Sequence, residues 1–574
     1  MKLRGLRFVF LIILCALAAN SFSLDREAFT FTKYDLDISI APDQQRLGVR
    51  GKITIRNDSS LPQKFAVLQI SSSLAWRSIR AGDKPLQFVA QDYTSDIDHT
   101  GALSEAVVTL PEAVPPKGNF DLEIAYEGVI VLDARRLTRI DTPETAAHST
   151  DWDQISEKFT AVRGAGYVAW YPIATEGASL SEGADLFEVL GRWKARESVS
   201  SMHLRISVTS NDEEDKPELL VNATTCPTAH EAGAQFVADC TYRSMALTAP
   251  AFVIANYEIA DRAAVAVHFL RGHDASAVNY ADAAEKAEPF IAEWFGAPRS
   301  KAETADLSDP NAAPYESGPL LLTPLAGNDP KLAGLVAVHQ LAHAAFSSPR
   351  AWINEGLAHF AQALYLEHQN GRRAALDYMG LHRSAFSRAG KAATAPRSED
   401  EVNRSLVNSA DEQLYRSKAM CVWWMLRDMV GDAALKKAIA SYHPEEDKEP
   451  SYVPRLIQAQ TQRDLEWFFD DWVYRDHGLP DFKVESAFTR KTLPDGYMLT
   501  ITVNNAGGAG AEVPLTVKFA GGEVTERLVV RGKSNGVIRI EVPKPPEEVV
   551  VNDGSVPESD MTNNVFKIEA AESK

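Results

Sequence analysis

The stretch Leu335–Leu364, LVAVHQLAHAAFSSPRAWINEGLAHFAQAL, decides how the rest of the chain is interpreted. His339 and His343 are four residues apart, so on a helix both imidazoles lie on one face and can reach the same ion. The segment 347–350, Ser-Ser-Pro-Arg, breaks the apolar pattern and predicts a turn into a second helix. Glu355 would come from that second helix. Two histidines and a carboxylate form a His₂Glu set, which leaves the fourth position of a zinc ion open.

This stretch resembles the gluzincin metallopeptidases, and most closely their aminopeptidase N-like (M1-type) branch. The family pattern is H-E-x-x-H, a spacer, and a helix that reads W-L-N-E-G. The present chain has HQLAH at 339–343 and, after a shorter spacer, WINEG at 352–356. The resemblance implies one zinc ion held by His339, His343 and Glu355.

Two carboxylates of the family pattern are amides in this chain. Gln340 stands where the family carries the glutamate that takes a proton from the zinc-bound water, and a neutral amide cannot accept that proton. Loss of a general base typically lowers the rate by about 10²–10⁴-fold. Gln362 stands where the family usually has a second glutamate that supports the ligands. Both changes predict impaired hydrolysis.

Three further residues take a role from the resemblance or from their spacing. Glu316, in APYESGP, aligns with the family glutamate that holds the free α-amine of the substrate. Tyr415 aligns with the tyrosine that donates a hydrogen bond to the oxyanion, a contribution worth about 10²–10³ in rate. His359 lies one turn after Glu355 and faces the same way. It is either an ordinary hydrogen-bonded histidine or a support beside the zinc.

The fold class predicted from the whole chain is multidomain α+β. Alternating apolar and polar residues, as in Tyr34–Ile40, indicate a large N-terminal β-sheet domain over 24–255, saddle-like in the family. A thermolysin-like, mostly helical gluzincin domain is expected over 256–479, with a helix over Ala277–Phe295 that ends at Gly296. A small β-sandwich is expected over 480–574. The charged segment from Asp133 to about Lys158 interrupts the strands and is interpreted as a surface insertion.

The N-terminus predicts export. Residues 1–23 combine three basic residues, an apolar run of about a dozen and small residues, which is typical of a secretory signal peptide. The run is too short to span a bilayer, so we expect a periplasmic or extracellular protein, with membrane association through an uncleaved leader as the alternative. An exported protein permits a disulfide between Cys226 and Cys240.

Composition narrows the partners. The net charge is −19, and loss of the three basic leader residues makes it about −22, so no basic surface is expected for nucleic acid. No later segment reads as a membrane helix. Two functions remain: a zinc aminopeptidase-like enzyme that acts on peptides or protein N-termini, and a catalytically inactive pseudo-peptidase that serves as a peptide-binding or scaffold protein of the cell envelope. The sequence does not give the oligomeric state.

Overall fold

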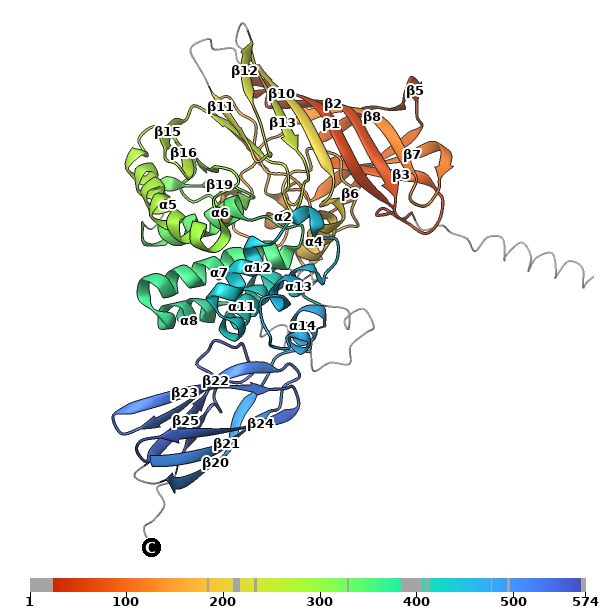
Figure 1. The fold of residues 1–574 in the computed structure, drawn as a ribbon. Coiled ribbons are helices and arrows are strands. Elements are labelled where there is room, and N and C mark those ends of the chain that lie inside the picture. Colours follow the sequence, from red (N-terminus) through yellow and green to blue (C-terminus); the bar gives the residue numbers. More distant parts are fainter. Residues whose placement is uncertain are drawn as a thin grey trace, which may run out of the picture.

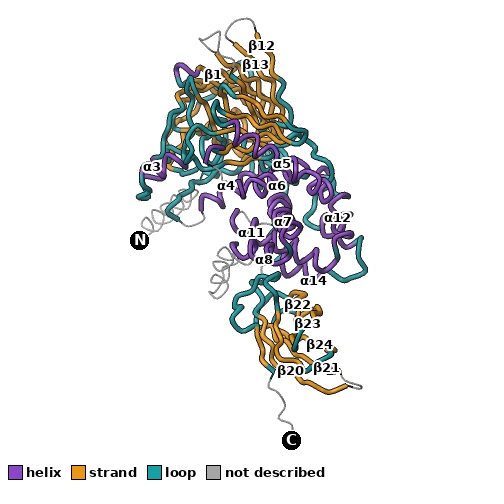
Figure 2. Tube along the Cα trace, turned by 90° about the vertical axis from the view of Figure 1, so that its left-hand side faces the viewer, coloured by secondary structure: helices purple, strands orange, loops and turns teal. Residues whose placement is uncertain are grey.

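A computed structural model gives the structure of the protein over residues 24–182, 185–209, 217–231, 235–327, 330–382, 405–407, 412–475, 477–492 and 496–568. The predicted leader, 1–23, lies outside these ranges. Strands form the N-terminal part, helices with a small sheet the middle, and strands again the C-terminal part (Figures 1 and 2). The predicted multidomain α+β class is confirmed, while the exact domain boundaries stay a prediction.

The N-terminal part is built on one large sheet. Its strands are β1 (Phe29–Ala41), β2 (Arg46–Asn57), β4 (Leu74–Ala81), β5 (Lys84–Pro85), β8 (Asn119–Val129), β10 (Ser201–Thr209), β12 (Thr228–Glu231) and β13 (Gln235–Tyr242). They lie in the order β12-β13-β10-β1-β2-β8-β4-β5. Tyr34 and Leu36 are buried while Asp35 and Asp37 are exposed, so the alternation seen in the sequence marks the two faces of β1.

Two smaller sheets and one helix complete this part. The sheets are β3-β7-β6, made of Gln63–Ser71, Ala102–Val114 and Phe88–Thr94, and β11-β14-β9, made of Glu218–Val221, Phe252–Ala255 and Phe159–Val162. Helix α4 covers Asp185–Glu197. The large aromatic side chains Trp170 and Trp193 are fully buried between these elements. A disulfide joins Cys226 to Cys240, as the sequence predicted.

The expectation of a surface insertion from Asp133 to Lys158 is met only in part: the segment interrupts the strands and much of it is exposed, but Arg136, Asp151 and Asp153 are buried. The segment forms α2 (Arg135–Thr138) and α3 (Glu144–Thr150). The guanidinium of Arg136 donates two hydrogen bonds of 2.7 Å to the carboxylate of Asp151, and both side chains are buried. A run of charged residues predicts an exposed surface, but the charges of Arg136 and Asp151 are paired inside the protein, where a buried ion needs a partner.

The middle part contains a mixed sheet with the order β15-β16-β17-β19-β18. The strands are β15 (Glu258–Asp261), β16 (Val265–Phe269), β17 (Ala302–Asp306), β18 (Tyr315–Ser317) and β19 (Leu320–Thr323). Strands β16, β17 and β19 are parallel, while β15 and β18 run antiparallel at the two edges. Helices α5 and α6 pack beside this sheet (Figure 1).

The helices of the middle part are α5 (Asp274–Phe295), α6 (Pro330–Ala345), α7 (Ala351–Asn370), α8 (Arg372–Leu381), α11 (Glu412–Val430), α12 (Asp432–Ala440), α13 (Tyr452–Gln458) and α14 (Glu466–Phe469). The predicted stop at Gly296 is confirmed, since this glycine follows the last residue of α5 with a φ of 85°. The break at 347–350 is also confirmed, because α6 ends before it and α7 begins after it.

The C-terminal part contains two sheets, β20-β21-β24 and β23-β22-β25-β26. Their strands are β20 (Phe482–Thr492), β21 (Gly496–Asn505), β22 (Ala511–Phe519), β23 (Gly522–Val530), β24 (Ser534–Val542), β25 (Pro546–Val551) and β26 (Val565–Lys567). One continuous cluster of buried apolar side chains runs from the helices, through Trp472, to Phe482 and Leu515 in these sheets. Within the described residues, we find no helix with the length and apolar character needed to cross a membrane.

Candidate metal centre

The two histidines of the HQLAH motif meet on one face of α6. Their Nε2 atoms are 3.2 Å apart, and the side chains of His339 and His343 are nearly buried. The spacing of four residues therefore produces the juxtaposition that the helical period predicts. Burial lowers the pKa of His343, and burial with the neighbouring imidazoles of His359 and His343 lowers the pKa of His339 well below its ordinary value. Both rings are thus held in the neutral form that binds metals.

The carboxylate of Glu355 reaches the pair from α7. Its Oε1 lies 3.6 Å from Nε2 of His343, and its Oε2 lies 3.9 Å from Nε2 of His339. Burial alone raises the pKa of Glu355, but Arg416, together with His343 and His339, outweighs burial and lowers the pKa to about 2. Glu355 is therefore an anion at neutral pH. The structure brings together the three residues that the sequence proposed as ligands.

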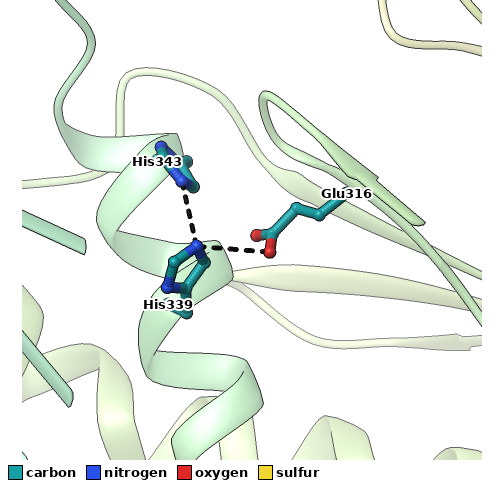
Figure 3. A group of neighbouring side chains, drawn as sticks. All are labelled: Glu316, His339 and His343. Carbon is teal, nitrogen blue, oxygen red and sulfur yellow. Dashed lines mark hydrogen bonds and ion pairs between the residues drawn. The ribbon is translucent and has the colours of Figure 1, made fainter. Parts of the chain in front are cut away.

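Glu316 belongs to the same cluster. It projects from β18 toward α6, and its Oε2 lies 3.4 Å from Nε2 of His339 (Figure 3). Ligand atoms of Glu316, His339 and His343 all lie within 4.8 Å of one another. Its other oxygen, Oε1, is buried and has no hydrogen-bond partner among the described residues. Burial, and then the charge of Glu355, raise the pKa of Glu316 well above its ordinary value.

The residues around the histidines fix their protons. Gln362 Oε1 lies 3.3 Å from Nδ1 of His339, so that nitrogen donates and Nε2 is left with its lone pair. Asn354 donates through its side-chain nitrogen to Nδ1 of His343 at 3.2 Å, which leaves the proton of His343 on Nε2, facing His339. A metal ion at this position would replace that proton, as metal binding to histidine commonly does.

His359 and Gln362 both lie beside His339. The imidazole of His359 is centred 4.7 Å from that of His339, and its Nδ1 contacts the hydroxyl of Tyr378 at 3.4 Å. The Tyr378 hydroxyl donates to Gln362 Oε1 at 2.7 Å, and the Gln362 amide donates to the carbonyl of Leu335 at 3.0 Å. Atom Nε2 of His359 is buried without a hydrogen-bond partner among the described residues.

Gln340 points into the protein and uses its whole side-chain amide. Its Oε1 accepts hydrogen bonds from the hydroxyl of Tyr280 at 2.8 Å and from that of Thr304 at 3.1 Å. Its Nε2 donates to the carbonyls of Glu303 at 2.8 Å and Pro319 at 3.0 Å. An amide has two acceptor and two donor positions, and all four are filled. The side chain therefore joins α6 to α5 and to the sheet.

Arg416 is the residue of this centre that the sequence reasoning missed. Its Nε lies 3.0 Å from Oε2 of Glu355, and the side chain reaches the site from α11. Its position directly after Tyr415 was the available signal, because a basic residue there follows a candidate site residue on a helix. Tyr415 itself lies in α11, but its side chain is outside the described part of the structure.

The sheet-and-helix arrangement is similar to the fold of a solved aminopeptidase. The crystal structure of Legionella pneumophila aminopeptidase A in complex with aspartic acid matches with a TM-score of 0.58 and 12% identity, over 94% of this chain and 60% of that one. The M1 zinc metallopeptidase of Deinococcus radiodurans matches with a TM-score of 0.46 and 15% identity, over 79% of this chain and 95% of that one. No family model and no curated protein matches the sequence.

The Legionella comparison confirms the aminopeptidase-type fold expected from the two motifs, and at such identity it shows the fold alone. The chain spans about three fifths of the length of the Legionella enzyme. The residues present nevertheless fit a zinc ion. Ligand atoms about 2.0–2.1 Å from a tetrahedral zinc lie about 3.3 Å from one another. The four distances measured here, between 3.2 and 3.9 Å, are close to that separation.

Proposed function

We propose that the chain is an exported zinc metallopeptidase of aminopeptidase type whose hydrolytic step is impaired by Gln340. The observation that carries the proposal is the convergence of His339, His343 and Glu355 from two consecutive helices within 3.9 Å. One zinc ion at this point would polarise a peptide carbonyl as a Lewis acid. Peptides or protein N-termini are the substrates that the fold and the resemblance favour.

Other residues of this chain orient the ligands and would contact the substrate. Gln362 holds the ring of His339 through Nδ1, and Asn354 contacts Nδ1 of His343. By the resemblance, Tyr415 would donate a hydrogen bond to the oxygen of the attacked carbonyl. The amide of Gln340 cannot accept a proton, so a substrate is turned over slowly.

Metal analysis is the first test. We expect about one zinc ion per chain in protein purified without chelator, and loss of the metal in His343→Ala. The matched control is His368→Ala, which removes an exposed histidine from the same helical region. Protein that retains no transition metal would remove the chemistry and leave the fold in place.

Activity is the second test. Aminoacyl and peptide substrates should release their N-terminal residues slowly, in a reaction that a chelator stops and His343→Ala abolishes. Turnover at the rate of an ordinary aminopeptidase would contradict the role given to Gln340.

N-terminal sequencing of the exported protein tests the predicted leader, because cleavage is expected near Ala19 or Ser23.

A second candidate function is supported by the surroundings of Gln340. Its four hydrogen bonds give Gln340 a structural role. This role favours a pseudo-peptidase that binds peptides or acts as a scaffold in the cell envelope. Calorimetry with peptides, with and without chelator, separates the two functions. Tight binding without product supports the second, and no binding argues against it.

A further inference from the structure

We propose that Glu316 is a fourth protein ligand of the metal ion, so that side chains of this chain enclose the ion when no peptide is bound. The inference rests on the proposed function in one respect, which is that a metal binds at His339, His343 and Glu355. It differs in what it gives to Glu316, which the family resemblance makes a binding group for the substrate amine.

The strand that carries Glu316 directs its side chain at the metal centre. Tyr315 and Ser317, its neighbours in β18, both face the N-terminal part: the ring of Tyr315 packs edge-on against Tyr167, and Ser317 donates to the carbonyl of Ala249. Side chains of a strand alternate between its two faces. Glu316 therefore projects the other way, toward α6 (Figure 3).

The distances place the carboxylate among the ligands. Oε2 of Glu316 is 3.4 Å from Nε2 of His339, whereas the nearest oxygen of Glu355 is 3.9 Å from the same atom. Neighbouring ligand atoms on a tetrahedral zinc are about 3.3 Å apart. Glu316 thus lies closer to the first histidine than Glu355, the residue that the family motif identifies as a ligand.

The second oxygen of Glu316 supplies an independent observation. Atom Oε1 is buried, and no described group donates a hydrogen bond to it. A buried carboxylate oxygen without a partner is costly, and a bound cation satisfies it. Two carboxylates, Glu316 and Glu355, also balance the two positive charges of a zinc ion.

A closed shell has a chemical consequence. Zinc sites with four protein ligands are structural, whereas catalytic sites keep one position for water or substrate. If Glu316 fills that position, the ion ties the edge strand β18 to α6 and α7. Glu316 would then keep water from the metal, and Gln340 would provide no base to activate water that did reach it.

Cobalt(II) in place of zinc tests this coordination directly, because the absorption of cobalt reports the number and kind of its ligands. The proteins are the wild type, Glu316→Gln, Glu316→Asp and a control, Glu303→Gln, which changes a carboxylate of β17, in the same sheet, that contacts His268. Azide serves as the probe for an open position. Zinc affinity is measured by competition with a chromophoric chelator.

We expect the wild type to bind one cobalt ion with the intense absorption of a tetrahedral site and to ignore azide. Glu316→Gln should bind zinc at least about tenfold more weakly and should respond to azide, since even residues that only support ligands contribute about 10–100-fold. Glu316→Asp keeps the charge but shortens the side chain, so it should also weaken binding. The control should match the wild type in zinc affinity, cobalt absorption and its lack of response to azide.

Three results would overturn the inference, and they are distinguishable. Unchanged zinc affinity and cobalt absorption in both Glu316 variants would show that this residue is not a ligand, while the proposed metal site stands. An azide response in the wild type would show an open position. A wild type that binds neither metal removes the proposed function and the inference together. Melting of the metal-free proteins controls for folding, and Glu316→Gln should melt no lower than the wild type.

Discussion

The side-chain carbonyl of Gln340 accepts a hydrogen bond of 2.8 Å from the hydroxyl of Tyr280, sixty residues earlier in the chain. Two hydrogen bonds from the Gln340 amide to the carbonyls of Glu303 and Pro319 complete the contact between α6, α5 and the sheet. The residue that occupies the position of a general base is thereby part of the packing of the middle region.

Gln340→Glu should therefore destabilise the protein rather than restore hydrolysis. An ionised carboxylate cannot donate to the two carbonyls, and its charge would face both oxygens; the carbonyl of Pro319 keeps the amide of Glu303, but each buried group that loses its partner costs about 1–3 kcal/mol. At about 2–4 °C for each kcal/mol, we expect the melting temperature of this region to fall by at least about 4 °C. Tyr280→Phe, which removes one hydrogen bond and adds no charge, should have a smaller effect. A Gln340→Glu protein that melts like the wild type and gains peptidase activity would contradict this account.

The ion pair between Arg136 and Asp151 should contribute strongly to stability. Arg136→Met leaves the buried carboxylate of Asp151 with only a long contact of 4.0 Å to Arg163, and the loss of such a buried partner typically costs about 3–5 kcal/mol. Arg135→Met is a matched control, since Arg135 is exposed and pairs with Asp133 at the surface, where such a pair is worth about 0–1 kcal/mol. Thermal melting of both variants checks the prediction, and equal melting temperatures would show that the buried pair carries no weight.

His268 should make the stability depend on pH. It lies between Glu218 of β11 and Glu303 of β17, at 2.8 and 2.6 Å, with Tyr257 and Asp261 nearby. Burial lowers the pKa of His268, but the hydrogen bonds and charges of the two glutamates outweigh burial and raise the pKa to about 9. Because the folded pKa exceeds the unfolded value of about 6.5, the stabilisation is fully present below pH 6.5 and is lost as the pH rises through about 9.

The measurement compares the wild type with His268→Gln across that range. At pH 6 the wild type should be more stable by about 3 kcal/mol, because a pKa of about 9 in place of 6.5 is worth about 1.4 kcal/mol for each unit. At pH 10 most of that advantage should be gone. His203→Gln is the control for an exposed histidine, whose neighbours Asp35 and Asp239 are also largely exposed. An advantage that stays constant from pH 6 to 10 would exclude this explanation.

The contribution of the ligand histidines can be tested through zinc affinity, without measuring turnover. Replacement of His339 by Ala should lower zinc affinity by at least about tenfold, and Gln362→Ala should lower it by less, because Gln362 only orients His339 through Nδ1. Competition with a chelator measures both. Equal losses in the two variants would indicate that Gln362 does more than orient the ring.

Local patterns predicted the parts of the centre that are local. The spacing of His339 and His343 and the break before Glu355 were sufficient to predict two helices that share an ion, because the helical period converts sequence distance into direction. The alternation in β1 likewise predicted its buried face. These features need no knowledge of what packs against them.

The remaining features come from residues that are distant in sequence. The hydrogen bonds of Gln340 depend on Tyr280 and Thr304, which only the packing of α5 and the sheet brings near. The position of Glu316 beside His339 depends on the register of β18 with β19, and the contact of Arg416 with Glu355 depends on the packing of α11. The burial of Arg136 was missed because its charge says nothing about its partner.

Near residue 480, hydrogen bonds join the end of the helical region to the C-terminal sheets. The indole of Trp472 donates to the carbonyl of Gly510 at 2.7 Å, and the carboxylate of Asp471 accepts from the amide of the same glycine at 2.8 Å. The cluster of buried apolar side chains is also continuous across this junction. A protein truncated here would expose the apolar face of its helices to water. The helical region and the C-terminal sheets should therefore unfold in a single transition in a calorimeter, because the C-terminal strands support the helices.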